Sequence, residues 1–390
     1  MTPTLRLAST GFVATAVSFG PARMGFGLFL PTFRETFTLS STLAGLIASL
    51  GFLAFLVALP LTAWLSRRVG QRAPILLGTL SATAGFVAVA TASGTAGLAA
   101  GIALAGASAG FCWAPFNDAA ERVVPGEARA GALSAVSTGT TVGVAAAGAL
   151  FLGVTVGTVD WRLAWGVFAL VGVVAALMAG GGVPAGRARA RPAAAGAPAL
   201  FRKDVTPLYA AALCFGASNA VYLAFAADHV VAAGGLAGLP DRAAASVIFL
   251  GYGISGVVGL AAGRIEARTG VLALLGAIFA AFAASLVLVA LAPAAWAPVL
   301  VSAGLHGAAV MTISALLSFW SLRLFPGRGS LGFTAALVGV AAGSVVGPAL
   351  TGALADRFDL TTAFLVAAAA PLTATVVFTA RASRHRCRRA

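Results

Sequence analysis

The stretch Ser18-Phe-Gly-Pro-Ala-Arg-Met-Gly-Phe-Gly-Leu-Phe-Leu-Pro31 decides what kind of fold this chain can adopt. It lies in a run from Leu7 to Phe33 in which Arg23 is the only charged residue. About 20 apolar residues suffice for a helix to cross a bilayer. An arginine inside such a helix costs roughly 3 kcal/mol on insertion scales, so it must face a partner, a water-filled cavity or a ligand. The stretch therefore predicts a membrane-spanning helix that carries a buried arginine.

The composition of the whole chain agrees with a membrane protein. Of its 390 residues, 60% are hydrophobic and 9% are charged, a balance outside the range of ordinary soluble domains. The first apolar run is followed at once by another, so we interpret it as a retained helix and not as a signal peptide. Charge-free runs predict an all-α integral membrane fold with twelve transmembrane helices, at about residues 7–33, 40–65, 74–92, 96–123, 130–156, 163–182, 206–228, 243–263, 271–292, 297–322, 331–355 and 360–380.

An internal repeat divides these helices into two groups of six. At an offset of 200 residues, Arg68-Val-Gly70 matches Arg268-Thr-Gly270, and Gly139-xxx-Gly143 matches Gly339-xxx-Gly343. Matches of this kind at corresponding loops and helices indicate a duplication. We therefore expect two pseudo-symmetric bundles with a substrate site between them near the midplane. The expected boundaries are 1–182 and 206–380 for the bundles, 183–205 for a basic, flexible linker and 381–390 for a basic tail.

The positions of lysine and arginine orient the helices. With both chain ends in the cytoplasm, 20 of the 25 Lys and Arg residues fall in segments on the inner side and 4 on the outer side. Such an excess on one side is typical of cytoplasmic loops. The net charge of +14 is then explained by a surface that faces anionic inner-leaflet lipid. No folded basic domain remains for binding nucleic acid.

Several motifs resemble the major facilitator superfamily over essentially the whole chain. The segment from Thr62 to Arg72 resembles the family's loop between helices 2 and 3, although Ser66 stands where the family usually has aspartate. The region from Phe19 to Phe37 is most similar to the YbfB/YjiJ-type bacterial permeases. The resemblance implies a secondary transporter of the bacterial cytoplasmic membrane. It also implies a gating motif in two corresponding loops, made of Arg67, Arg68, Gly70, Arg72, Glu266, Arg268 and Gly270.

The resemblance further implies that helices 1, 4, 7 and 10 surround the cavity. At a rise of 1.5 Å per residue, Arg23 and Asn219 lie at similar depth, and no acidic residue stands at that depth in the other three helices. The planar guanidinium of Arg23 suits a carboxylate or another anion. The alternative is a structural arginine that is satisfied by helix carbonyls and Asn219. The candidate substrate-binding residues are Arg23, Ser108, Trp113, Phe116, Asn117, Asn219, Tyr222 and His306.

Two residues are candidates for proton coupling. His306 is the only ionisable group between Arg268 and Arg323, and its ordinary pKa range suits a proton carrier. A neutral histidine that bridges two helices is an equally good interpretation. Asp118 lies in the inner third of its helix, where an acid can relay protons or hold the structure together.

These observations predict a secondary active transporter of a small solute, an organic anion or metabolite, that works by alternating access and couples to protons. The alternatives are a proton-driven multidrug efflux antiporter, favoured by the aromatic candidates, and a non-transporting sensor or scaffold. The sequence contains no P-loop, zinc-ligand spacing or activated nucleophile. We therefore expect no enzyme activity, no cofactor and no metal site. The expected partners are the solute, protons and anionic lipid, with the protein as a monomer.

Overall fold

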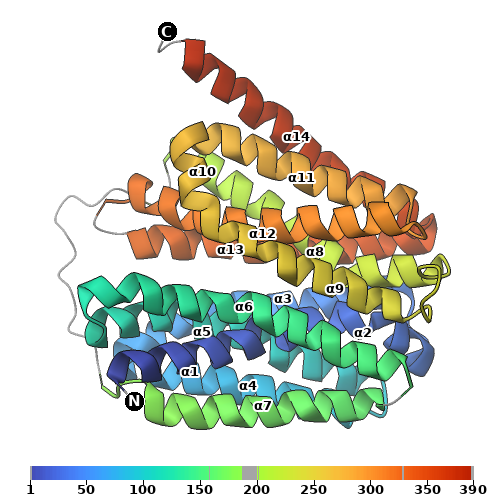
Figure 1. Ribbon diagram of the computed structural model, residues 1–390, viewed down its shortest axis with the longest axis horizontal. Helices are drawn as coiled ribbons and strands as arrows, with labels where there is room; N and C mark the ends of the chain where they lie inside the picture. Colours follow the sequence, from blue (N-terminus) through green and yellow to red (C-terminus); the bar gives the residue numbers. More distant parts are fainter. Residues whose placement is uncertain (1, 158, 187–199, 201, 327–328, 388–390) are drawn as a thin grey trace. The chain divides into compact units, whose positions relative to one another are not determined.

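The computed structural model describes residues 2–157, 159–186, 200, 202–326 and 329–387 (Figure 1). Most of the predicted basic linker, including Arg187, Arg189 and Arg191, lies outside the described residues, as does the end of the predicted tail. Within the described part the chain is helical, and its one β-bridge joins Gly70 to Gly186.

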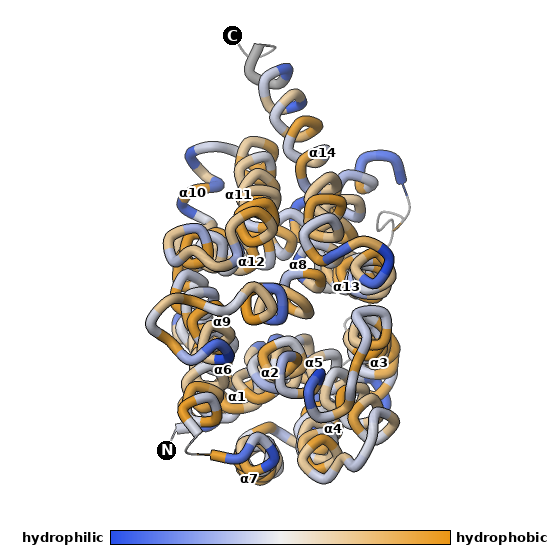
Figure 2. The backbone as a smooth tube through the Cα atoms, turned by 90° about the vertical axis from the view of Figure 1, so that its right-hand side faces the viewer, coloured by the Kyte–Doolittle hydropathy of each residue, from blue (hydrophilic) through white to orange (hydrophobic). Residues whose placement is uncertain are grey.

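Twelve segments are long and apolar enough to span a membrane, which confirms the predicted all-α fold. Figure 2 shows that hydrophobic residues follow the helices and that hydrophilic residues gather in the connections. The helices are α1 (Pro3–Phe19), α2 (Pro21–Phe37), α3 (Ser41–Val69), α4 (Arg72–Ala90), α5 (Thr95–Val123), α6 (Gly126–Thr155), α7 (Trp161–Gly182), α8 (Thr206–Ala232), α9 (Ala243–Ser255), η1 (Gly256–Ala261), α10 (Ala262–Thr269), α11 (Val271–Leu291), α12 (Trp296–Leu324), α13 (Gly329–Arg357) and α14 (Leu360–Cys387).

The first span differs from the single helix that the sequence predicts, because it is broken at Gly20. This residue has φ −79° and ψ −104°, and it separates α1 from α2. Proline at position 21 has no N–H to continue the hydrogen bonds of α1, but it fits the first position of a new helix. The backbone of Gly20 also lies against the backbone of Gly143, where a side chain at position 20 would not fit. The break puts Arg23 in the N-terminal turn of α2.

The eighth span also differs from a uniform helix. It consists of α9, a six-residue 3-10 segment η1 and α10. Segments of this tighter helix inside a span often occur at hinges. Gly259 in η1 packs against Met311, so a side chain at 259 would meet the Cβ of that residue at 2.5 Å.

The chain forms two compact units, which are described separately. Unit 1 comprises residues 1–39 and 47–191, and unit 2 comprises residues 40–46 and 192–390. In unit 1, α1 packs against α6, and α4 packs against α5 and α7. In unit 2, α8 packs against α13, and α11 packs against α12 and α14. These are corresponding pairs in the sequence repeat, so both units use the same pairing of helices.

The first turn of α3 belongs to unit 2 because a residue of α13 caps it. The backbone N–H groups of Ser41 and Thr42 donate to the two carboxylate oxygens of Asp356, both at 2.8 Å. The first N–H groups of a helix have no partners within the helix. A carboxylate supplied by another helix satisfies two of them and matches the positive end of the helix dipole.

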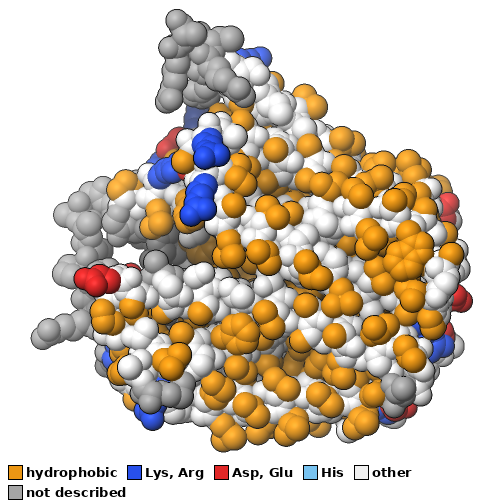
Figure 3. Space-filling view, in the orientation of Figure 1, with side chains coloured by type: hydrophobic (Ala, Val, Ile, Leu, Met, Phe, Trp, Pro, Cys, Tyr) orange, Lys and Arg blue, Asp and Glu red, His pale blue; other side chains and the backbone are white. Residues whose placement is uncertain are grey.

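The interior of unit 1 is built around aromatic side chains of the first and sixth spans. Trp165 of α7 has no exposed surface and packs edge-on against Phe29, Phe86 and Phe168, with ring centroids 5.4 to 5.7 Å apart. By contrast, the opposite face of the same helix leaves Leu177 73% exposed. Figure 3 shows hydrophobic side chains over much of the face drawn. Apolar residues on the outside as well as the inside are expected of helices that contact lipid.

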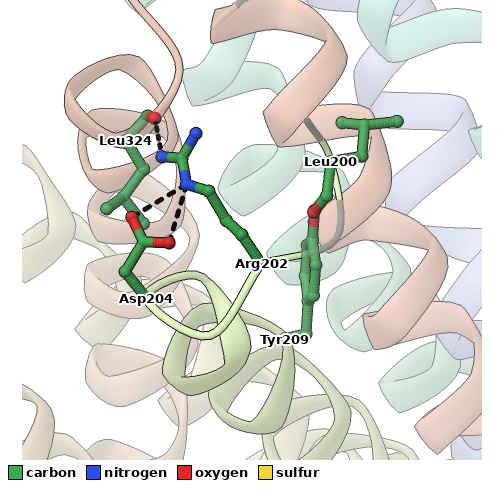
Figure 4. A network of polar contacts seen from close by, with 5 residues as sticks. All are labelled: Leu200, Arg202, Asp204, Tyr209 and Leu324. Carbon is green, nitrogen blue, oxygen red and sulfur yellow. Dashed lines mark hydrogen bonds and ion pairs between the residues drawn. The ribbon is translucent and has the colours of Figure 1, made fainter. Parts of the chain in front are cut away.

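Polar contacts at the start of α8 anchor the segment that enters unit 2 (Figure 4). The Nε atom of Arg202 lies 2.7 Å from Oδ1 of Asp204, and its Nη2 donates to the carbonyl of Leu324 at the end of α12. The hydroxyl of Tyr209 donates to the carbonyl of Leu200 at 2.9 Å. These bonds fix the entry of the chain into α8.

Candidate functional site

A buried polar cluster in unit 2 joins three of the predicted site residues. We call it the His306 cluster, and it consists of Asn219 and Tyr222 of α8, Tyr252 of α9, Ser285 of α11, and Ser302 and His306 of α12. Each of these side chains is at most 3% exposed. Four helices therefore contribute polar groups to one site that is closed to solvent in this structure.

The hydrogen bonds of the cluster fix where its protons lie. The hydroxyl of Ser302 donates to the carbonyl of Ser285 at 2.7 Å, and that of Ser285 donates to the carbonyl of Phe282 at 2.9 Å. Because each hydroxyl has only one proton, Ser302 must accept from Tyr222 at 3.1 Å. For the same reason, Ser285 must accept from Nδ1–H of His306 at 2.6 Å. All four contacts are hydrogen bonds at once only if Nδ1 of His306 carries a proton, which excludes the neutral tautomer protonated at Nε2 alone.

The other ring nitrogen of His306 is an acceptor without a donor. Nε2 is buried and has no hydrogen-bond partner among the described residues. Leaving such a group unpaired costs about 1–3 kcal/mol. The ring of Tyr222 stacks on the imidazole at 3.9 Å between centroids, Phe282 meets it edge-on at 4.9 Å, and Tyr252 lies at 6.1 Å. The imidazole is therefore enclosed by aromatic rings and shielded from water.

Asn219 joins the cluster at its edge. The hydroxyl of Tyr252 donates to Oδ1 of Asn219 at 3.3 Å. The adjacent Ser218 is also buried, at 2% exposed, and its hydroxyl interacts with the thiol of Cys214. Within the described residues, Nε2 of His306 is therefore the unsatisfied buried group of the cluster.

Arg23 lies in unit 1 in an aromatic environment. Its guanidinium carbon is 4.7 Å from the ring centroid of Phe55, 5.3 Å from that of Phe52 and 5.8 Å from that of Phe19. The side chain is half-buried. A cation in the first turn of a helix adds to the positive end of the helix dipole, whereas an anion there would offset that end. The break at Gly20 and the guanidinium thus produce a local positive potential inside the span.

The predicted residues of α5 lie in four kinds of environment. Trp113 packs edge-on against Phe19 at 5.1 Å, so it shares an aromatic neighbour with Arg23. Ser108 is completely buried, and its hydroxyl is unpartnered among the described residues. Phe116 is 1% exposed and belongs to a hydrophobic core cluster that includes Leu7. Asn117 and Asp118 are exposed, and Asp118 interacts with the side chain of Gln71.

The first-half gating motif binds the end of α7. Gly70 has φ +92°, a conformation that glycine adopts without strain. Nε of Arg72 donates to the carbonyl of Val183 at 2.8 Å. Arg122 donates to the side chain of Gln71 and to the carbonyl of Gly186, both at 2.9 Å. Two arginines therefore hold the carbonyls at the C-terminal end of α7 through contacts inside unit 1. Arg67 and Arg68 are exposed, and Arg68 lies over the ring of Trp64 at 5.6 Å.

The second-half motif contains a bidentate ion pair. Nη1 and Nη2 of Arg323 donate to Oε1 and Oε2 of Glu266 at 2.6 and 2.8 Å. Gly270 has φ +80° and stands where Gly70 stands in the first half. Arg268 is exposed. The pair joins α10 to α12, and the sequence reasoning did not identify Arg323 as the partner of Glu266.

Replacing Glu266 by glutamine is expected to lower the free energy of unfolding by about 1 kcal/mol, because a charged hydrogen-bonded pair is lost at a partly exposed site. Thermal unfolding of the purified protein measures the change. Arg323→Gln and the double variant complete a cycle that isolates the pair. Additive effects of the two single changes would show that the pair contributes nothing.

The sequence did not predict several residues that surround these sites. Ser285 and Ser302 lie in the long charge-free run that also contains His306, so their polarity was an available signal. Phe52 and Phe55 of α3, which contact Arg23, look like ordinary span residues. No feature of the sequence marks them as neighbours of an arginine.

Comparison with known proteins identifies the class. A family model described as Major Facilitator Superfamily matches residues 11–324. The protein therefore belongs to the Major Facilitator Superfamily, and its class is that of the secondary transporters. No curated protein matches the chain.

Solved structures agree on the fold. A mutant of the nucleoside transporter NupG is similar with a TM-score of 0.79 and 12% identity, covering 97% of this chain and 99% of that chain. The peptide transporter POT in complex with sulfate is similar with a TM-score of 0.77 and 16% identity, covering 98% and 94%. A bacterial homolog of the human lysosomal transporter Spinster, inward-facing and unoccupied, gives 0.67 and 17%, covering 97% and 95%. At these identities the likeness concerns the fold alone.

Proposed function

We propose that this protein transports a small organic anion or metabolite and that Arg23 binds its negative group. The supporting observation is the guanidinium of Arg23 in the N-terminal turn of α2, directly after the break at Gly20. In transporters, helix N-termini exposed by such breaks point at anionic groups of substrates. A half-buried guanidinium among aromatic rings is less hydrated than a surface cation, so it gains more from pairing with an anion.

Multidrug efflux is the second candidate function. The burial of two aromatic residues of the predicted site makes efflux less favoured than transport of an anion. Phe116 and Tyr222 are each 1% exposed, and both are occupied in internal packing. A site for diverse hydrophobic drugs needs aromatic surface that a ligand can reach. Arg23 would also repel cationic compounds.

Proton coupling is proposed at His306. Its Nε2 has a free lone pair in the tautomer that the hydrogen bonds require. Neither a carboxylate nor a Lys or Arg side chain is recorded in contact with the imidazole within the described residues; its neighbours are the rings of Tyr222, Tyr252 and Phe282 and the hydroxyl of Ser285. A proton at Nε2 would be stabilised by these rings. Asp118 is the second candidate for coupling.

The remaining features of the proposal follow the sequence. We infer alternating access, a place in the YbfB/YjiJ-type branch, and a bacterial cytoplasmic membrane with both chain ends in the cytoplasm. The two loops with Gly70 and Gly270 are the proposed gating elements, since each contains or adjoins an arginine that donates hydrogen bonds at a helix end.

Proteoliposomes test the solute class. The purified protein is assayed with a panel of anionic, neutral and cationic solutes of similar size, with and without a pH gradient. We expect flux of anionic solutes only. Flux restricted to cationic or hydrophobic compounds would favour the efflux alternative, and movement of any solute would exclude a non-transporting scaffold.

His306→Gln is expected to abolish the dependence of flux on the pH gradient while counterflow of the solute continues. In the wild type the protonated fraction of one group changes up to about tenfold per pH unit, and glutamine cannot titrate. His229→Gln is the matched control, because His229 is also a buried histidine of unit 2 and contacts the carbonyl of Ala290 at 3.4 Å. A pH dependence that persists in His306→Gln would exclude this residue as the proton carrier.

A further inference from the structure

A small basic pocket lies in unit 1 where four helices end. It has a volume of about 190 Å³, and its lining includes Arg6 of α1, Arg72 of α4, Val123 of α5 and Gly181 of α7. Spans begin at Pro3 and Arg72 and end at Val123 and Gly182. A position at the ends of spans corresponds to the headgroup level of a bilayer.

Each of the two arginines of this pocket has N–H donors that make no hydrogen bond within the described residues. Among the described residues only Nε of Arg72 is engaged, by the carbonyl of Val183 at 2.8 Å, and its two Nη groups have no partner there. The guanidinium of Arg6 has no hydrogen-bond or ion-pair partner among the described residues, and the side chain is exposed. Guanidinium groups with free N–H donors match the oxygens of a phosphate.

The dipoles of the helices that meet at the pocket also help to determine which charge a ligand there must have. The C-termini of α5 and α7 bring negative ends to the pocket, and Arg72 offsets that of α7 through its bond to Val183. The N-terminus of α1 at Pro3 brings a positive end beside Arg6. The uncompensated charge in the pocket is therefore positive.

The surroundings of the pocket favour a lipid as the source of the phosphate. Leu5 is 53% exposed and Val69 is 50% exposed, and each adjoins a charged or polar end of its helix. Basic pockets between transmembrane helices bind the headgroups of anionic lipids. We propose that Arg6 and Arg72 bind the phosphate of an anionic phospholipid in this pocket. The proposal is independent of which solute is transported.

Glycine at 181 makes a test possible that leaves the charges unchanged. A Cβ at Gly181 would meet nothing within 4 Å, so a larger side chain there fits without disturbing the fold and adds bulk at the lining of the pocket. The neighbouring Gly180 has equally open space but does not line the pocket. Gly181→Leu and Gly180→Leu therefore form a matched pair. Arg6→Gln has Arg67→Gln as its counterpart, since Arg67 is also exposed in unit 1 and lies outside the lining.

The full-length protein in detergent is titrated with phosphatidylglycerol, with phosphatidylcholine and with inorganic phosphate, and bound molecules are counted by native mass spectrometry. We expect one phosphatidylglycerol to be retained preferentially. Arg6→Gln should weaken this retention about fivefold, the effect of one arginine at a membrane surface. Gly181→Leu should also weaken it, through bulk at the lining and with the charges unchanged. The two control variants should retain it.

The other outcomes are equally informative. Inorganic phosphate that binds with the same sensitivity to Arg6→Gln would support the phosphate site and assign it to the free ion. Equal losses in Arg6→Gln and Arg67→Gln, with no effect of Gly181→Leu, would overturn the site, because retention would then follow surface charge alone. No preference for phosphatidylglycerol or phosphate over phosphatidylcholine would also overturn it.

Discussion

Arg23→Met is expected to reduce transport of the anionic solute by about two orders of magnitude. Removal of one partner from a desolvated, hydrogen-bonded charge pair costs about 3 kcal/mol, and methionine cannot replace the guanidinium. Methionine keeps an unbranched apolar side chain against Phe52 and Phe55, which contact Arg23. Because the variant also removes the cost of a charge in the span, its yield and thermal stability should not fall. Initial rates of flux in proteoliposomes measure the effect.

Two further variants show whether charge or geometry matters at this position. Arg23→Lys is expected to recover only part of the flux, because an ammonium cannot donate two parallel hydrogen bonds. Arg34→Gln is the control on the same helix. Arg34 donates to the carbonyl of Leu39 at 2.7 Å at the end of α2, far from the break at Gly20. Full activity of Arg23→Met would contradict the proposal and leave Arg23 as a structural residue.

Gly343→Leu is expected to lower the free energy of unfolding by about 3 kcal/mol or more. A Cβ at Gly343 would overlap the carbonyl oxygen of Leu213 and would stand 2.8 Å from the backbone nitrogen of Ala217. The obstacle is therefore the backbone of α8, which cannot rotate away as a side chain can. Overpacking of interiors costs about 1–3 kcal/mol when side chains can adjust. Here we expect the upper end of this range or beyond.

The control for this prediction is Gly304→Leu. Gly304 is also a helical glycine of unit 2, but a Cβ there would meet nothing within 4 Å. Leucine should be tolerated at 304, since it favours the helix over glycine by about 1 kcal/mol. Thermal unfolding and the yield of monodisperse protein give the comparison. Equal stability of the two variants would show that α8 and α13 do not depend on this close approach.

The sequence was sufficient for the spans because hydrophobicity and length alone decide whether a helix can cross a bilayer. The charge-free runs predicted all twelve segments. Both copies of the glycine repeat stand at a close approach of two helices, since Gly143 lies against Ala16 of α1 and Gly343 lies against Leu213 of α8. The sequence did not predict the break after Gly20, since the region from Leu7 to Phe33 is a single apolar run with one charge. A glycine followed by proline does not by itself interrupt a helix, because Gly347 and Pro348 lie inside the continuous helix α13.

The candidate sites needed the tertiary structure, because they are made by side chains far apart in the chain. The resemblance placed Tyr222 and His306 among the candidate residues of one cavity, but the position of a residue along its helix does not fix the direction of its side chain. The stacking of these two rings, and the hydroxyl of Ser285 that fixes the tautomer of His306, depend on how α8, α11 and α12 rotate against one another.

By itself, the sequence determined an integral membrane protein of twelve helices with a costly arginine at position 23. Only the tertiary structure decided what surrounds that arginine: a broken helix and the rings of Phe19, Phe52 and Phe55. The physical reason is that apolarity is a property of each residue, whereas the environment of a charge is created by residues from other helices.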